Sequence, residues 1–226
     1  MLKTLQNAFK IKDVRRRIFY VFLMVVVIRI GSQLPIPGVD QSYFKDWFAS
    51  QSNDAFTFFD ALTGGSLTEM SIFALNITPY ITSSIIIQLL TIAIPKLEEM
   101  QRDGEEGRKK LTAITRYLTI GLSLFQSIAM TVGFGNRGLI PEMNFMKAVV
   151  VVACLTAGSA MLMWIGEQIT DKGIGNGISI VLMVNIVSRI PSDLVTLFNQ
   201  FVKGKTYARG GLAALIIIAI IVLVVV

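Results

Sequence analysis

The stretch of this sequence that most resembles a chemical motif is the glycine-rich run GIGNG at residues 173–177. Glycine-rich loops cradle phosphates when they follow a strand and lead into a Lys-Ser or Lys-Thr pair. Here the glycines join two apolar segments, and no such pair follows them. A tight turn is therefore the favoured interpretation. The nearby carboxylates Glu167 and Asp171 lie at the edge of an apolar segment, where charged side chains meet water.

Enzyme chemistry is disfavoured by the residue types that the chain lacks. It contains no histidine and a single cysteine, Cys154. The commonest general base and metal ligand is therefore missing, and neither an intrachain disulfide nor a cysteine metal cluster can form. The patterns of zinc proteases, serine hydrolases, nucleotide-binding loops and calcium-binding loops are absent from the sequence. We expect no catalytic residue, no metal and no cofactor, although serine–lysine chemistry is formally compatible with the composition.

One charged residue, Arg29, falls inside an apolar block, near its outer end and shortly before Pro35. A charge at the middle of a bilayer costs roughly 3 kcal/mol on insertion scales. A long arginine side chain can avoid this cost by extending its guanidinium to the membrane surface. Two interpretations stay open: Arg29 reaches the surface in this way, or it makes a polar contact with another helix or with segment 35–70.

A mixed helix face is more informative about function. At about 100° per residue, these side chains share one side of a helix: Thr78, Ile81, Thr82, Ile85 and Leu89. Small hydroxyls beside isoleucine suit a helix interface, and they equally suit a wetted channel with an apolar constriction. A similar apolar pair, Ile178 and Leu182, begins a later apolar block. The pattern by itself does not separate the two possibilities.

The elements that would position these residues are membrane helices. The chain is 53% hydrophobic and 16% charged, whereas soluble domains carry about 25% charged residues. A spanning helix needs about 20 mainly apolar residues. Blocks of this kind lie at 18–34, 71–94, 112–133, 146–166 and 176–198. A further apolar run, 212–226, is too short to cross untilted, so we expect a chain that ends within a sixth helix.

Lysine and arginine indicate the orientation, because they are enriched in cytoplasmic loops. The leading segment 1–17 and the loop 96–116 are strongly basic, whereas segment 35–70 carries Lys45 against several carboxylates. This contrast predicts a cytoplasmic N-terminus, although the later loops 167–177 and 189–211 are less clear. Two roles for the basic clusters stay open: contact with anionic lipid, or docking of an acidic or RNA partner.

A break precedes the second apolar block, and we call residues 56–70 the broken segment. The run 56–62 is apolar but too short to span. Gly64 and Gly65 end it, because glycine readily adopts the left-handed cap conformation. Ser66 and Glu69 then have the spacing of a capping box, which predicts a helix starting near Leu67. The favoured interpretation is a re-entrant helix that fills a cavity, since irregular backbone at membrane depth must be buried or line water. An amphipathic surface helix is the alternative.

Several long stretches resemble one family, and the likeness runs through the whole chain in order. They are GGSLTEMSIFALNITPYITSSIIIQLL (64–90), LMWIGEQITDKGIGNGISI (162–180), RIGSQLPIPGVD (29–40) and EEGRKKLTAITRY (105–117). These stretches resemble the SecY family, the central subunits of bacterial protein-conducting channels. The resemblance implies an all-α integral membrane protein with the first half of the SecY-type inverted-repeat helical bundle, including a re-entrant plug helix. It also implies residues 1–17 as a cytoplasmic N-terminus, 18–198 as a five-helix half, and 199–226 as an external loop and a truncated sixth helix.

The resemblance also implies functional residues. The pore ring of the family corresponds here to Ile81, Ile85, Ile178 and Leu182. The plug corresponds to the broken segment, with Phe58, Phe59, Ala61, Leu62, Gly64, Gly65, Ser66 and Leu67. The lateral gate, through which membrane segments reach lipid, corresponds to Ile86 and Gln126.

The expected function is therefore a channel subunit that moves unfolded polypeptides across the bacterial cytoplasmic membrane. The partners that the resemblance implies are SecE- and SecG-type small membrane subunits, the SecA ATPase, the ribosome, the signal peptide or translocating chain, and the lipid bilayer. Two alternatives stay open from the residues alone. One is a polytopic secondary transporter, because broken helices also occur there; it lacks support from buried ionisable residues, of which the apolar blocks hold almost none apart from Arg29. The other is a receptor or scaffold.

Overall fold

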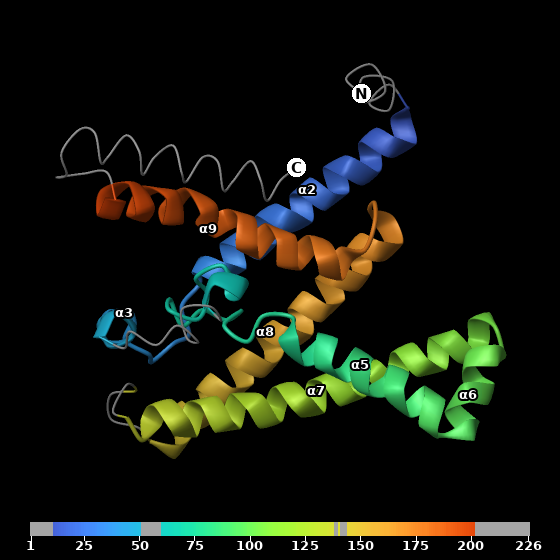
Figure 1. The fold of residues 1–226 in the computed structure, drawn as a ribbon. Helices are drawn as coiled ribbons and strands as arrows, with labels where there is room; N and C mark the ends of the chain where they lie inside the picture. Colours follow the sequence, from blue (N-terminus) through green and yellow to red (C-terminus); the bar gives the residue numbers. More distant parts are fainter. Residues whose placement is uncertain (1–10, 51–59, 138–139, 141–143, 202–226) are drawn as a thin grey trace.

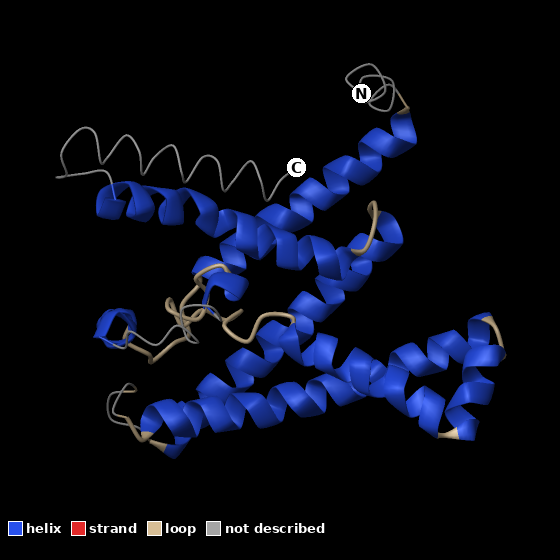
Figure 2. Cartoon of the chain, in the orientation of Figure 1, coloured by secondary structure: helices blue, strands red, loops and turns tan. Residues whose placement is uncertain are grey.

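The computed structural model of the 226-residue chain describes residues 11–50, 60–137, 140 and 144–201 (Figure 1). The helices are α2 (Lys12–Gln33), α3 (Gln41–Ser50), α5 (Thr78–Ala93), α6 (Pro95–Arg102), α7 (Glu105–Gly135), α8 (Phe145–Lys172) and α9 (Gly177–Phe201). The described residues contain no strand (Figure 2), so the all-α prediction is confirmed. Each of the apolar blocks that begin at residues 18, 71, 112, 146 and 176 contains a helix. The expected sixth helix at 212–226 lies outside the described residues.

Helix α8 is the centre of the bundle. It contacts α2, α5, α7 and α9, and Figure 1 shows it crossing between α7 and the α2–α9 pair. Closely packed membrane helices favour small residues at such crossings. At Gly158 of α8 an added methyl group would overlap the carbonyl oxygen of Ile72, and at Gly177 it would overlap the carbonyl oxygen of Gly166. The missing side chains at these glycines therefore allow the backbone at Ile72 and the start of α9 to lie close against α8.

A stripe of buried hydroxyl side chains runs along α7, and one of them contacts α8. Hydroxyl residues recur at every fourth position of α7 and are all buried: Thr115, Thr119, Ser123, Ser127 and Thr131. Each hydroxyl donates to a carbonyl within its own helix. Ser127 also lies 3.0 Å from the hydroxyl of Thr156 in α8. The stripe thus satisfies its own polar groups and lets the two helices approach closely.

By length and composition, two of the described helices, α7 and α8, are suited to cross a membrane. Helices α5 and α6 would form a third span if joined, but they are bent by 103° at their junction. The apolar part of α9, Gly177–Ser192, is shorter. Among the described residues, then, each of the five expected spans contains a helix, but two of these helices, or three if α5 and α6 form one span, are long and apolar enough to cross a membrane.

Helix α5 begins later than predicted. A helix starting near Leu67, and a span from residue 71, are both wrong, because residues 64–77 form turns apart from an isolated bridge between Pro35 and Ser71. The start signal that operates is Pro79, in the first turn of α5. Proline suits that position, since its fixed φ is helical and its missing N–H has no intrahelical acceptor there.

The turns are held by neighbouring backbone rather than by a capping box. The Ile36 N–H donates to the Met70 carbonyl at 3.1 Å, and the Ile72 N–H donates to the Leu34 carbonyl at 3.0 Å. The carboxylate of Glu69, predicted to cap a helix, instead lies 2.9 Å from the ammonium of Lys45 in α3. The spacing of a capping box is therefore present without the helix that it normally begins.

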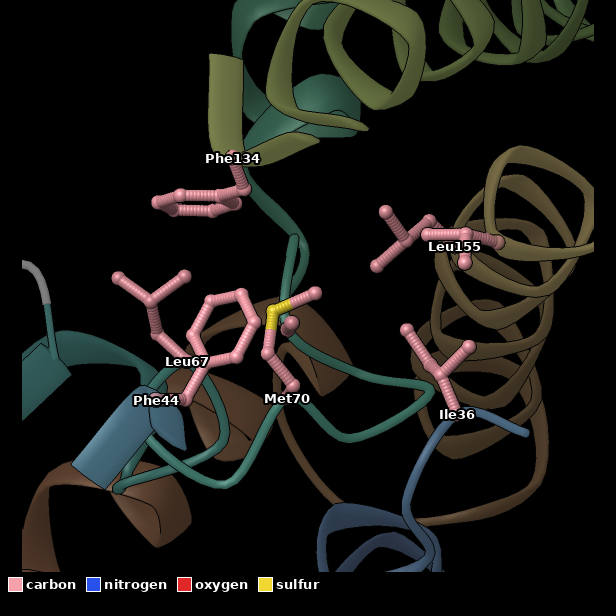
Figure 3. Close-up of a cluster of buried hydrophobic side chains, with 8 residues drawn as sticks. Ile36, Phe44, Leu67, Met70, Phe134 and Leu155 are labelled. Carbon is pink, nitrogen blue, oxygen red and sulfur yellow. The ribbon is translucent and has the colours of Figure 1, made fainter. Parts of the chain in front are cut away.

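Two buried apolar clusters organise the bundle. The first, which we call the Phe134 cluster, contains Ile36, Phe44, Leu67, Met70, Ala74, Phe134, Val151 and Leu155. Figure 3 shows Phe44, Leu67 and Met70 gathered near Phe134, and the Phe44 and Phe134 rings meet edge to face with centroids 5.0 Å apart. The second, the Ile165 cluster, contains Ile28, Phe73, Ile77, Leu162, Ile165, Ile169 and Val181. The turns from residue 64 to 77 contribute to both clusters.

Candidate functional site

Three of the expected ring residues pack against the same buried cluster. Ile81 of α5 and Ile178 and Leu182 of α9 are partly buried and pack against the Ile165 cluster. The starts of the two helices both lie close to Gly166 of α8, since a methyl group added there would contact Ile77, which precedes α5, and Ile178 of α9. The result is an apolar edge built from two helices that lie far apart in the sequence.

The fourth expected ring residue, Ile85, lies one turn further along α5 and is 51% exposed. On the opposite side of this helix Ser83, Ile87 and Thr91 are buried. Leu89 continues the exposed side at 61%. Helix α5 therefore has one face packed in the bundle and one apolar face that the described residues leave uncovered.

In the described part of the broken segment a short helix stops at the two glycines, as predicted. Residues 60–63 are helical. The Gly65 N–H then donates to the Asp60 carbonyl at 3.0 Å, and the Gly64 N–H donates to the Ala61 carbonyl at 3.2 Å. This is the Schellman arrangement, and Gly64 has the left-handed φ of +68° that it requires. The predicted glycine stop is thus confirmed.

The other plug residues differ in their surroundings. Ala61 and Leu62 are partly buried, and Ser66 and Leu67 are buried. The hydroxyl of Thr63, rather than that of Ser66, accepts from the Leu67 N–H at 3.4 Å. Phe58 and Phe59 lie outside the described residues.

Polar side chains join the broken segment to α9, and the sequence interpretation missed them. Asp60 forms an ion pair with Arg189. Beyond the segment, Asn76 accepts a hydrogen bond from the amide of Asn185 at 2.9 Å. Asn185 lies within an apolar block, where polar residues are uncommon and mark contacts between helices. This residue was the sequence signal that could have pointed to the network.

Arg29 belongs to the same network. Its guanidinium donates to the hydroxyl of Ser188 at 2.9 Å, and that hydroxyl donates to the carbonyl of Asn185. Of the two interpretations of Arg29, the polar contact with another helix is the one that the structure contains.

The expected gate residues are placed on neighbouring helices. Ile86 lies on α5 and Gln126 on α7, both partly buried, and the two helices contact each other. Neither side chain belongs to the two buried clusters. A cavity of about 550 Å³ also lies between α5 and α7, with Ser84, Gln88 and Arg108 among its lining residues. The gate assignment therefore rests on the resemblance, with the helix pairing as its structural context.

The predicted tight turn at residues 173–177 is confirmed, since it joins α8 to α9 within a few residues. Arg17 of α2 donates to the carbonyl of Gly173 at 3.2 Å. At the same end of α8, Arg116 of α7 forms an ion pair with Glu167 at 2.9 Å. These contacts fix α2 and α7 to the end of α8. In the described part of the chain, no three His, Cys, Asp or Glu side chains gather as a candidate metal site.

Comparisons with known proteins converge on one family. The family model described as SecY matches residues 71–226. The protein translocase subunit SecY of Halalkalibacterium halodurans is 44% identical over 206 residues, which cover 90% of this chain and 47% of the relative. The Bacillus subtilis subunit of the same name is 40% identical over 232 residues, which cover 100% of this chain and 53% of the relative. The chain thus spans about half the length of the curated relatives it matches.

Two solved structures share the fold. One is described as "The structure of a protein conducting channel", and the other as "Sec61 in the Canine ribosome-channel complex from the endoplasmic reticulum". Each aligns with a TM-score of 0.56 and 20% sequence identity, covering 90% of this chain and 42% of the other. At this identity the likeness establishes the fold alone.

Proposed function

Because this chain belongs to the SecY family, we propose that it forms the N-terminal half of a protein-conducting channel. The complete channel moves unfolded polypeptides across the bacterial cytoplasmic membrane and releases membrane segments sideways into lipid. In this proposal the chain is not an enzyme: it guides a polypeptide and makes or breaks no covalent bond. The observation that supports this most is the packing of Ile81, Ile178 and Leu182, from two helices far apart in the sequence, against the Ile165 cluster.

In this proposal the ring consists of these three side chains together with Ile85. Branched apolar side chains at a constriction exclude water and ions when nothing fills it. The exposure of Ile85 fits a side chain that faces a pore completed by residues outside the described part of the chain. A moving polypeptide then replaces water at the ring, and the side chains close around it.

The broken segment is the plug, which covers the ring from outside in the resting state. Its Schellman turn at Gly64 stops the short helix, and the turns to residue 77 connect it to α5, which supplies Ile81 and Ile85. Irregular backbone of this kind is tolerated at membrane depth only where protein or water surrounds it. Turns rather than a continuous helix also allow the segment to move without unwinding α5.

The gate, partners and orientation complete the proposal. Ile86 and Gln126 line the lateral gate between α5 and α7. The N-terminus and the loop 96–116 face the cytoplasm, where the SecA ATPase or a ribosome supplies the energy. Small subunits of the SecE and SecG type assemble with the complete protein.

In this proposal the chain has three parts. Segment 1–17 is the cytoplasmic N-terminus, 18–198 is the five-helix half, and 199–226 is the external loop and the start of a sixth helix. Family membership leaves the alternative of a secondary transporter without support.

The test of this proposal is transport by the complete protein, reconstituted in lipid vesicles with its small subunits and the SecA ATPase. We expect a polypeptide that carries a signal sequence to become protected from added protease inside the vesicles, in an ATP-dependent manner. The same polypeptide without its signal sequence is the matched control and should stay digestible. Equal protection of both polypeptides, or of neither, contradicts the proposal.

A further inference from the structure

The broken segment is held on two sides by contacts of different chemistry. Toward α7 and α8 it is held by apolar packing, because Leu67 and Met70 lie in the Phe134 cluster, while Glu69 near its end forms a more exposed ion pair with Lys45 of α3. Toward α9 it is held by polar contacts, directly through the Asp60–Arg189 ion pair and indirectly through Asn76, which donates to the Leu62 carbonyl and accepts from Asn185. Polar groups regain hydrogen bonds with water when they separate, so the α9 side is the one that can open reversibly.

We infer that Asp60, Arg189, Asn76 and Asn185 are positioning residues that latch the broken segment to α9 and thereby set how readily the channel opens. This inference rests on the proposed function, since it assumes that the segment is the plug. It adds to the proposed function a specific set of contacts that hold the plug closed.

The ion pair is built into the segment rather than added to its surface. The side chain of Asp60 is 6% exposed and that of Arg189 is 26% exposed. The other carboxylate oxygen of Asp60 accepts from the Thr68 N–H at 2.9 Å, and its backbone carbonyl accepts from the Thr63 hydroxyl at 3.0 Å. Asp60 therefore both stabilises the turn at residues 60–68 and pairs with Arg189 of α9. Loss of Arg189 would leave a buried carboxylate without its cationic partner, which strongly disfavours the closed arrangement.

The asparagine pair extends the latch toward α5. Asn76 and Asn185 are both buried. The Asn76 amide also donates to the Leu62 carbonyl at 3.0 Å, so Asn76 bridges the broken segment and Asn185 of α9. The Oδ1 of Asn185 is buried and accepts no hydrogen bond from the described residues. A network that is only partly satisfied gains more from access to water than a fully satisfied one, which favours a contact that can be released.

Gly64 brings the two backbones together at the latch. A methyl group added at this position would lie 2.8 Å from the Asn185 carbonyl oxygen and 3.0 Å from the Ser188 hydroxyl. The next residue, Gly65, has a similar φ of +87° but no atom within 4 Å of an added methyl group. The two glycines therefore share the backbone strain of an alanine substitution, while only Gly64 adds a collision with α9. They form a matched pair of test sites.

The first experiment measures the resting ion conductance of the complete protein in planar bilayers. We expect Arg189→Gln and Asp60→Asn each to raise this conductance by at least about tenfold, because Arg189→Gln leaves the buried Asp60 carboxylate without this cation and Asp60→Asn removes the charge that attracts α9. Arg189→Lys keeps the positive charge and should stay close to the unchanged protein. Glu98→Gln is the control and should match the unchanged protein, since it neutralises a carboxylate that pairs with Arg102 within α6, outside the broken segment. The double variant Asp60→Asn/Arg189→Gln should conduct less than the product of the two single effects predicts.

The second experiment compares Gly64→Ala with Gly65→Ala by amide hydrogen exchange of residues 60–70. Exchange is independent of transport and reports how often the segment opens. We expect the Thr68 amide to exchange at least about ten times faster in Gly64→Ala than in Gly65→Ala.

The outcomes separate the latch from the proposed function. If Arg189→Gln and Gly64→Ala match the unchanged protein in both exchange and conductance, the latch is wrong while the channel can still transport. If exchange responds as expected but the complete protein neither conducts nor transports, the latch stands as a structural contact and the channel assignment fails. If Arg189→Lys behaves like Arg189→Gln, the positive charge is not what holds the segment, and the inference is also wrong.

Discussion

Replacing Ile81 and Ile85 together with serine will raise the resting ion conductance of the complete protein by at least about tenfold, which corresponds to a permeation barrier lowered by about 1.4 kcal/mol. The physical reason is that a narrow apolar ring stays dry. Serine is smaller and binds water, so the constriction becomes both wider and wet. Conductance in planar bilayers, without ATP or substrate, measures this effect directly.

Two comparisons guard this result against misfolding. Ile81 packs on the Ile165 cluster, so its loss also removes buried contacts, whereas Ile85 is 51% exposed and Ile85→Ser alone should fold normally. Leu90→Ser is the matched control, because Leu90 is also partly exposed and lies on a different side of α5. A conductance that stays at the level of the unchanged protein in the double variant, with normal folding, contradicts the ring assignment.

A cysteine at Leu62 will react with a membrane-impermeant thiol reagent from outside at least about ten times faster when a polypeptide is stalled in the channel. Thiol reactivity depends on access to solvent. Leu62 is partly buried, and its carbonyl accepts a hydrogen bond from Asn76. Displacement of the plug breaks this contact and exposes the side chain. The reaction is measured in a Cys154→Ser background, since Cys154 is the chain's own cysteine.

A cysteine at Val132 serves as the control for this labelling. Val132 lies near the end of α7 and is 48% exposed, so its reaction rate should be similar with and without a stalled polypeptide. Equal rates at position 62 in the two states would mean that the broken segment does not move during transport.

The helices were predictable because their signal is local. Apolar blocks of about the length of the bilayer identified α2, α5, α7, α8 and α9, although their ends differ. The glycine stop was predictable for the same reason, since a left-handed cap depends on the residue itself. The start of α5 was not, because two local signals competed. The capping-box spacing of Ser66 and Glu69 suggested one start, and Pro79 determined another.

The latch was not predictable from local patterns. Asp60 and Arg189 are 129 residues apart, and Asn76 and Asn185 are 109 apart. No periodicity connects residues at such separations, and each charge alone resembles an ordinary loop residue. The ring was predictable only in part. The spacing of Ile81 and Ile85 indicated a common helix face, while their pairing with Ile178 and Leu182 came from the family resemblance. The structure brings Ile81, Ile178 and Leu182 to one cluster, and the completion of the ring by Ile85 stays a proposal.

The most direct test of the channel proposal is photo-crosslinking of a stalled polypeptide from position 85. A photoreactive amino acid replaces Ile85 in the complete protein, and a second variant carries it at Tyr117, an exposed residue of α7. We predict that the stalled polypeptide crosslinks to position 85, and only when it carries a signal sequence, while position 117 gives no polypeptide adduct. A stalled polypeptide that crosslinks to position 117 as strongly as to position 85, or to position 85 not at all, would contradict a polypeptide path past this ring.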